Sequence, residues 1–262
     1  MIQRMRATVG CLVVLSIAGC AHMGPLPKAG RTPAQREQLV KPGTFGEQGK
    51  GAAADVRRAF FDFWNEQVIR EDVAVSTVFM GDSITELWNL PVYFQASDGI
   101  IQNRGISGDL AAHMARRFEA DVIQLKPRNV VILAGTNDVA RHLGANRPDP
   151  EIIADVTANV TKMMDAARAA GIHTLVCSIL PTNADYRLHE GKKRILPAIN
   201  EKLKAACREK GCIWVDCWSH MTDANGDLRK DLARDGLHPH YAGYEIMARL
   251  VKEAARTNGL RL

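Results

Sequence analysis

The sequence predicts an α/β domain in which a parallel sheet is covered by helices on both faces. Five short apolar segments recur along the chain, and stretches with helical periodicity separate them. Segments that are apolar at every position, rather than at every second one, are typical of strands buried on both faces. The expected fold class is therefore a three-layer α/β/α domain.

The predicted elements follow in order from residue 53. A helix is expected over 53–70, because Phe60, Phe61, Trp64 and Val68 fall near helical spacing. The predicted strands lie at 77–80, 99–102, 129–134, 173–178 and 212–215.

The clearest helix lies between the third and fourth predicted strands. Its apolar residues advance by three and four from Ile152 to Ala167, and Gly171 is suited to the position that ends a helix. In sheets of this kind the reactive crevice lies at the carboxyl ends of the strands. Polar residues that directly follow a strand are therefore the first candidates for a functional site.

The first 19 residues are expected to be a signal peptide. Arg4 and Arg6 precede an apolar run over 7–18, which is shorter than the roughly 20 residues of a membrane-spanning helix. The small residues that end at Cys20 resemble the lipobox of bacterial lipoproteins. A plain secretory signal with an incidental Cys is the alternative.

The lipobox resemblance implies that Cys20 becomes the lipidated first residue of the mature chain, held to a membrane by its acyl chains. Ala21 follows Cys20, and this implies the bacterial outer membrane, facing the periplasm of the cell envelope. Residues 20–51 are rich in Pro and Gly and lack apolar periodicity, so a flexible tether is expected there. Residues 52–262 are expected to form the folded domain.

Composition excludes several classes of protein. A chain of 262 residues with 46% hydrophobic and 24% charged residues is not disordered, collagenous or a multi-span membrane protein. A net charge of +5 is too small to argue for nucleic acid as a partner. Six Cys in a chain of this length do not form a disulfide scaffold. Cys207 and Cys212 flank a helix-to-strand turn and could pair in an oxidising compartment, but the sequence leaves this open.

Two segments far apart in the chain carry the parts of a nucleophilic site. Ser83 follows the first predicted strand at a plausible helix start, where a Ser is also a common helix cap. Asp235 stands three residues before His238, a spacing that lets a carboxylate orient an imidazole. His240 is the nearest rival to His238.

Four short blocks complete a resemblance to the SGNH hydrolases, also called GDSL-type esterases or lipases. The blocks are, in order, Gly81-Asp82-Ser83-Ile84, Asn103-Arg104-Gly105, Gly135-Thr136-Asn137-Asp138 and Asp235-Gly236-Leu237-His238-Pro239. The resemblance implies a mostly parallel, flavodoxin-like sheet of five strands. It implies Ser83 as the nucleophile, His238 as the general base and acid, and Asp235 as its orienting carboxylate.

The resemblance also implies an oxyanion hole made by the backbone N–H groups of Ser83 and Gly105 and the side-chain amide of Asn137. A structural hydrogen-bonding role is expected for Asp82. Metal-ligand and nucleotide-binding motifs are absent from the sequence, so neither a metal nor a cofactor is expected.

The expected activity is ester hydrolysis through an acyl-enzyme on Ser83. A small O-acyl (acetyl) ester of a carbohydrate or small molecule is the preferred substrate class, because no apolar lid insertion is seen. A lysophospholipase or acyl-thioesterase is the alternative, and a catalytically silent surface-binding lipoprotein is a third. Basic residues in two loops, among them Lys192, Lys193 and Arg194, are expected either to line the crevice and favour anionic substrates or to form ordinary solvated surface.

Overall fold

The computed structural model describes residues 25–46, 52–145 and 147–262. Its centre is a parallel sheet of five strands in the order β2-β1-β3-β4-β5. The strands are β1 (Val75–Gly81), β2 (Ile100–Gly105), β3 (Asn129–Leu133), β4 (His173–Cys177) and β5 (Ile213–Val215). The strand order reverses beside β1, and crevices at such points bind ligands in open α/β sheets.

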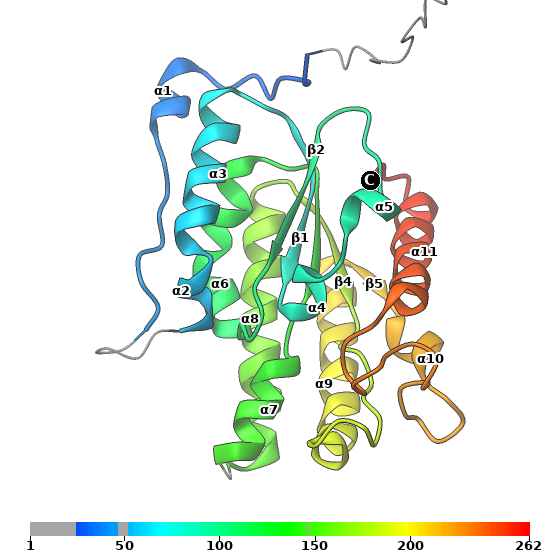
Figure 1. Ribbon diagram of the computed structural model, residues 1–262. Coiled ribbons are helices and arrows are strands. Elements are labelled where there is room, and N and C mark those ends of the chain that lie inside the picture. The colour runs from blue at the N-terminus through cyan, green and yellow to red at the C-terminus, as the bar shows by residue number, and fades with distance from the viewer. Residues whose placement is uncertain (1–24, 47–51, 146) are drawn as a thin grey trace, which may run out of the picture.

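Helices cover both faces of the sheet (Figure 1). The helices are α1 (Pro33–Glu37), α2 (Ala53–Val56), α3 (Arg58–Arg70), α4 (Ser83–Glu86), α5 (Leu90–Tyr93), α6 (Ala111–Asp121), α7 (Thr136–Ala145), α8 (Asp149–Ala169), α9 (His189–Lys210), α10 (Cys217–Met221) and α11 (Tyr241–Thr257), with a 3-10 turn η1 (Ile123–Leu125). One core lies between the sheet and α3, α6, α8 and α9, and the other lies between the sheet and α4, α5, α10 and α11. The predicted three-layer α/β/α fold is confirmed.

The central strands show why their sequences are continuously apolar. In β1, Val78 and Met80 point into the first core, while Phe79 points into the second. In β3, Val130 points into the first core and Val131 points into the second. The side chains on both faces of these strands are therefore buried. Burial of a large apolar side chain contributes roughly 1.5–3 kcal/mol to the stability of the fold.

The helix predicted over 53–70 is interrupted. Arg57 lies between α2 and α3 and serves as the C-cap of one and the N-cap of the other. The apolar spacing that predicted this helix includes Phe60 and Trp64, which are exposed in the structure, so part of the periodicity marks an outward face.

The expectation of a flexible tether over 20–51 is wrong for residues 25–46, which pack on the domain beside α3 (Figure 1). The Arg31 side chain is buried, and its guanidinium donates to the carbonyls of Val73 and Leu125 at 3.1 and 2.6 Å. The Arg31 backbone N–H donates to Asp72 at 2.8 Å. Phe45 is buried against His113. Sparse apolar periodicity hid these contacts, because single side chains rather than a regular face make them.

Cys20 and the predicted signal peptide lie outside the described residues. None of the helices in the part of the chain that the structure describes has the length and apolar character needed to span a bilayer.

Candidate active site

Ser83 stands where β1 passes into α4. Asp82 caps this short helix by accepting a hydrogen bond from the Ile84 N–H at 3.0 Å. Gly81 makes the tight passage possible, because a Cβ at this position would lie 2.1 Å from Thr85 Oγ1. The strand end and the cap together fix the Ser83 backbone. The Ser83 residue is 8% exposed, so its hydroxyl faces a restricted opening.

Ser83, His238 and Asp235 form a hydrogen-bonded chain. Ser83 Oγ lies 2.9 Å from His238 Nε2, although 155 positions separate the two residues. His238 Nδ1 lies 2.6 Å from Asp235 Oδ2. The other Asp235 oxygen, Oδ1, accepts hydrogen bonds from the backbone N–H groups of His238 and Leu237. This arrangement can hold the imidazole so that Nε2 accepts a proton from the serine hydroxyl.

The Asp235 carboxylate is kept ionised by its neighbours. Partial burial acts to raise the pKa of Asp235, but the hydrogen bonds from His238 and Leu237 and the nearby imidazole outweigh it, so the pKa lies below its usual value. Gly236 shapes this turn with a φ of 73°, and a Cβ there would lie 2.4 Å from Asn183 Oδ1. The turn therefore packs tightly against the loop that follows β4.

His240, the rival imidazole, has another role. It is the N-cap of α11, and its Nδ1 accepts a hydrogen bond from the Ala242 N–H at 3.2 Å. Its ring stacks on Tyr241 at 5.1 Å between centroids. Ser83 pairs with His238, and His240 starts the helix that follows.

The Gly105 N–H is already used within the protein. It donates to Asn103 Oδ1 at 2.8 Å, so the expectation that it serves as an oxyanion donor is wrong for this structure. Gly105 instead lets β2 approach α4, because a Cβ there would lie 2.1 Å from the Glu86 nitrogen. The glycine of the sequence block thus has a packing role.

The turn after β2 offers another glycine. Gly108 is exposed, has a φ of +80°, and its N–H has no acceptor among the described residues. The turn is held against α4 by the Ser107 N–H, which donates to Glu86, and the Asp109 carbonyl accepts from Asn137 Nδ2 at 3.1 Å. Gly108 was not among the site residues expected from the sequence, although the Gly108-Asp109 pair after a predicted strand was an available signal.

Asp82 is buried among other charges behind Ser83. Burial raises the pKa of Asp82 to about 7, and the carboxylates of Asp138 and Asp109 act in the same direction, while the Ile84 N–H and Lys192 oppose it. Its second oxygen, Oδ2, has no partner in the described structure. The helix-capping bond agrees with the structural role expected for this residue.

Lys192, Lys193 and Arg194, which were expected in a loop, lie in the first turns of α9. Lys192 is fully buried, with Nζ 3.3 Å from Thr136 Oγ1 and 4.6 Å from the centre of the Tyr186 ring. Burial lowers the pKa of Lys192 to about 8. Lys193 pairs with Asp227, and Arg194 pairs with a carboxylate of α8. The expectation that these cations line the crevice or form ordinary surface is therefore wrong for Lys192, which is buried, whereas Lys193 and Arg194 are solvent-accessible and ion-paired.

Among residues 25–46, 52–145 and 147–262, no group of three or more His, Cys, Asp or Glu side chains could hold a metal ion. Cys207 and Cys212 are free thiols in the structure, as are Cys177 and Cys217.

Comparison with known proteins shows the family to which the chain belongs. Residues 79–246 match the GDSL-like Lipase/Acylhydrolase family. An acetylxylan esterase from Geobacillus stearothermophilus is 27% identical over 155 residues, which are 57% of this chain and 68% of that protein. The esterase TesA from Pseudomonas aeruginosa is 29% identical over 143 residues, 54% of this chain and 62% of that protein.

The fold comparison gives the same result. The crystal structure of an acylhydrolase from Bacteroides fragilis, itself described as putative, superposes with a TM-score of 0.65 and 28% identity, and covers 81% of this chain and 99% of that one. The chain belongs to the GDSL-like lipase/acylhydrolase family. Its activity is that of a serine ester hydrolase.

Proposed function

We propose that this protein hydrolyses esters through an acyl-enzyme on Ser83. His238 Nε2 takes the proton from Ser83 Oγ as that oxygen bonds to the ester carbonyl carbon, and then gives the proton to the leaving alkoxide. A water molecule, deprotonated by His238, attacks the acyl carbon; the bond from this carbon to Ser83 Oγ breaks, His238 returns the proton to Oγ, and the carboxylic acid leaves. Asp235 stabilises the imidazolium that forms in each half of the reaction. The hydrogen-bonded chain from Ser83 through His238 to Asp235 supports these roles most strongly.

The proposed oxyanion donors are the backbone N–H groups of Ser83 and Gly108 and the side-chain amide of Asn137. Negative charge develops on the carbonyl oxygen as Ser83 attacks, and fixed neutral donors stabilise it without reorganising. The free Gly108 N–H and the contact between Asn137 and Asp109 support this set. Gly105 is left out because its N–H donates to Asn103.

The proposed substrate is a small O-acyl, chiefly acetyl, ester of a carbohydrate or another small alcohol. Likeness to an acetylxylan esterase supports this class. Tyr241, three residues after His238, is 75% exposed, and its ring is suited to stack on the apolar face of a sugar. A lysophospholipase or acyl-thioesterase would instead have to accommodate a long acyl chain.

One experiment tests the nucleophile and another tests the substrate class. A fluorophosphonate probe should label the wild-type protein and leave Ser83→Ala unlabelled, with p-nitrophenyl acetate hydrolysis lost in the same variant. Labelling of a folded Ser83→Ala protein would refute the assignment.

A series of p-nitrophenyl esters from acetate to palmitate should show kcat/KM falling with chain length. A rise with chain length would favour the lysophospholipase or thioesterase instead.

We also propose that Cys20 carries the lipid anchor and places the enzyme in the bacterial cell envelope, at the periplasmic face of the outer membrane. The support is the lipobox-like segment that ends at Cys20. Fractionation of cells expressing Cys20→Ser should move the protein from the membrane to the soluble fraction. Unchanged membrane association would refute the anchor.

A further inference from the structure

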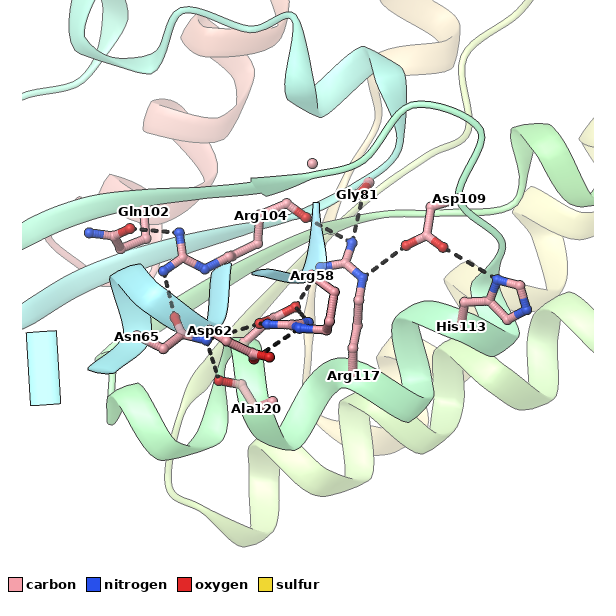
Figure 2. A network of polar contacts seen from close by, with 12 residues as sticks. Arg58, Asp62, Asn65, Gly81, Gln102, Arg104, Asp109, His113, Arg117 and Ala120 are labelled. Atoms are coloured by element: carbon pink, nitrogen blue, oxygen red, sulfur yellow. Dashed lines mark hydrogen bonds and ion pairs between the residues drawn. The ribbon is translucent and has the colours of Figure 1, made fainter. Parts of the chain in front are cut away.

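A buried network of charged and polar side chains lies behind the carboxyl ends of β1 and β2 (Figure 2). It joins three arginines and three aspartates from α3, β2, α6 and the turn that precedes α6. The charged members are Arg58, Asp62, Arg104, Asp109, Arg117 and Asp121. The Phe61 ring packs against all three guanidinium groups, at 4.9 to 5.9 Å from its centre. None of these side chains belongs to the proposed reacting groups.

Arg117 is the member that reaches the site. Its side chain is completely buried, and it uses four hydrogen bonds. Nε donates to Asp109 Oδ2 at 2.9 Å, and Nη1 donates to Asp121 Oδ2 at 2.9 Å. Nη2 donates to the Gly81 carbonyl at 3.2 Å and to the Arg104 carbonyl at 2.8 Å.

Three of these contacts lie within four residues of a proposed oxyanion donor. The Gly81 carbonyl ends β1, two residues before Ser83. The Arg104 carbonyl lies at the end of β2, where the chain turns toward Gly108. Asp109 follows Gly108 directly.

Asp109 also links Arg117 to the side-chain donor: its carboxylate accepts from Arg117 Nε, and its backbone carbonyl accepts from Asn137 Nδ2. One guanidinium therefore contacts two backbone carbonyls and the Asp109 carboxylate, in the chain segments that carry Ser83 and Gly108, and Asp109 in turn contacts Asn137.

We infer that Arg117 is a positioning residue that fixes the oxyanion hole from behind, an inference that rests on the donors proposed above. Planar guanidinium geometry suits this task, because its N–H groups point in fixed directions and can join carbonyl and carboxylate acceptors together. Donors that are already aligned act on the developing charge at no reorganisation cost. Arg117 thus contributes to transition-state stabilisation without touching the substrate.

Arg104 provides a matched comparison in the same network. It is as deeply buried as Arg117 and packs on the same Phe61 ring. Its guanidinium donates to the side chains of Gln102 and Asn65 and to the Asn103 carbonyl. None of these bonds reaches Gly81, Asp109 or Asn137. Loss of the Arg104 side chain should therefore affect stability without the same effect on the donors.

The test compares Arg117→Lys with Arg104→Lys in the full chain, by steady-state kinetics on p-nitrophenyl acetate and by thermal unfolding. Lysine keeps the charge, but a single ammonium group cannot reproduce the four contacts of the guanidinium. For Arg117→Lys we expect kcat to fall by about 10–100-fold, with KM within about threefold of wild type, because the donors act on the transition state. For Arg104→Lys we expect a lower Tm and kcat within about threefold of wild type.

Asp109→Asn is the second variant, and it keeps the test decisive where Arg117→Lys does not fold. It weakens the Arg117 contact beside Gly108 while retaining the backbone carbonyl that holds Asn137. We expect kcat to fall with KM little changed. The acid limb of the pH profile of kcat/KM should stay in place in both variants, because the network does not contact the His238 ring.

Equal losses of kcat in the Arg117 and Arg104 variants would overturn the inference, and so would a change in KM alone or a displaced acid limb. Ser83→Ala, measured in parallel, keeps the two proposals separate. Activity in Ser83→Ala would refute the proposed function. An inactive Ser83→Ala together with unchanged kcat in both Arg117→Lys and Asp109→Asn would refute only the role of Arg117.

Discussion

His238 contacts Asp235 twice, through its ring Nδ1 at 2.6 Å and through its own backbone N–H at 2.7 Å. The two residues lie on one tight turn, so the carboxylate orients the ring and also fixes the chain that carries it. The third donor to the carboxylate comes from Leu237. Because the Asp235 side chain is 55% exposed, its effect comes from this geometry and not from deep burial.

The contacts of Asp235 in this turn predict how Asp235→Asn changes activity and stability. The substituted amide can still accept from the backbone, but it cannot stabilise an imidazolium and favours the wrong tautomer of His238. We expect kcat to fall by about 10³–10⁴-fold, as in comparable triads. Thermal unfolding should change little, because the side chain is largely exposed. A loss of activity below tenfold would indicate that another group orients His238.

Substitutions of Asn137 and Asn103 should distinguish a loss of catalysis from a loss of stability. Asn137→Ala removes a proposed oxyanion donor, so kcat should fall by about 10²–10³-fold with KM little changed. Asn103→Ala is the control, because Asn103 bonds to the backbone of Thr85, Trp88 and Gly105 and should matter for stability. We expect Asn103→Ala to lower Tm more than it lowers kcat. A change in KM with kcat unchanged in Asn137→Ala would indicate that this residue binds the substrate instead.

Asp82 should make stability fall as the pH rises toward neutral. Its pKa is near 3.8 in the unfolded chain and is raised by burial to about 7 in the folded protein. The folded state therefore holds this proton more tightly. The resulting stabilisation is fully present below about pH 4 and is lost as the pH rises through 7.

Asp82→Asn removes this titration while keeping an oxygen for the Ile84 N–H. Urea denaturation at pH 5 and pH 8 should show the variant gaining stability relative to wild type at the higher pH, by a few kcal/mol. Groups that titrate equally in both proteins cancel in this difference. A stability difference that does not change between the two pH values would contradict the buried, protonated Asp82.

Much of the fold was predictable because strands that are buried on both faces of a sheet have apolar residues at every position. Val78, Phe79 and Met80 point to opposite cores, yet all three are buried, so the strand is apolar throughout. The proximity of Ser83 and His238 was predictable only through the resemblance of their motifs. Nothing in local periodicity connects residues 155 positions apart.

Other features depended on contacts that no local pattern records. Gly105 was expected to offer its N–H to the substrate, but the side chain of Asn103, two residues earlier, accepts the hydrogen bond from this N–H. Lys192 stands in a polar stretch that was expected to be a loop. It is buried because Thr136 and Tyr186, from two other segments, close around its ammonium group.

The N-terminal segment provides the last prediction, because residues 25–46 pack on a domain that was expected to begin at residue 52. A chain starting at Ala52 would lose Arg31, whose side chain bonds to the Val73 and Leu125 carbonyls and whose backbone N–H bonds to Asp72. Asp72 is itself buried and has an unusual positive φ of 54°, so it would lose partners that hold this corner.

We expect a protein that starts at Ala52 to unfold several degrees below one that starts at Pro25, since losing a buried charged contact and a buried aromatic costs about 2–4 kcal/mol. Arg31→Ala in the longer protein should reproduce part of this loss, whereas Lys41→Ala, in an exposed stretch of the same segment, should not. Specific activity at 25 °C should be similar in the two truncations, because the segment lies beside α3 and away from Ser83. Equal Tm values for the two proteins would show that residues 25–46 do not stabilise the domain and act only as a tether.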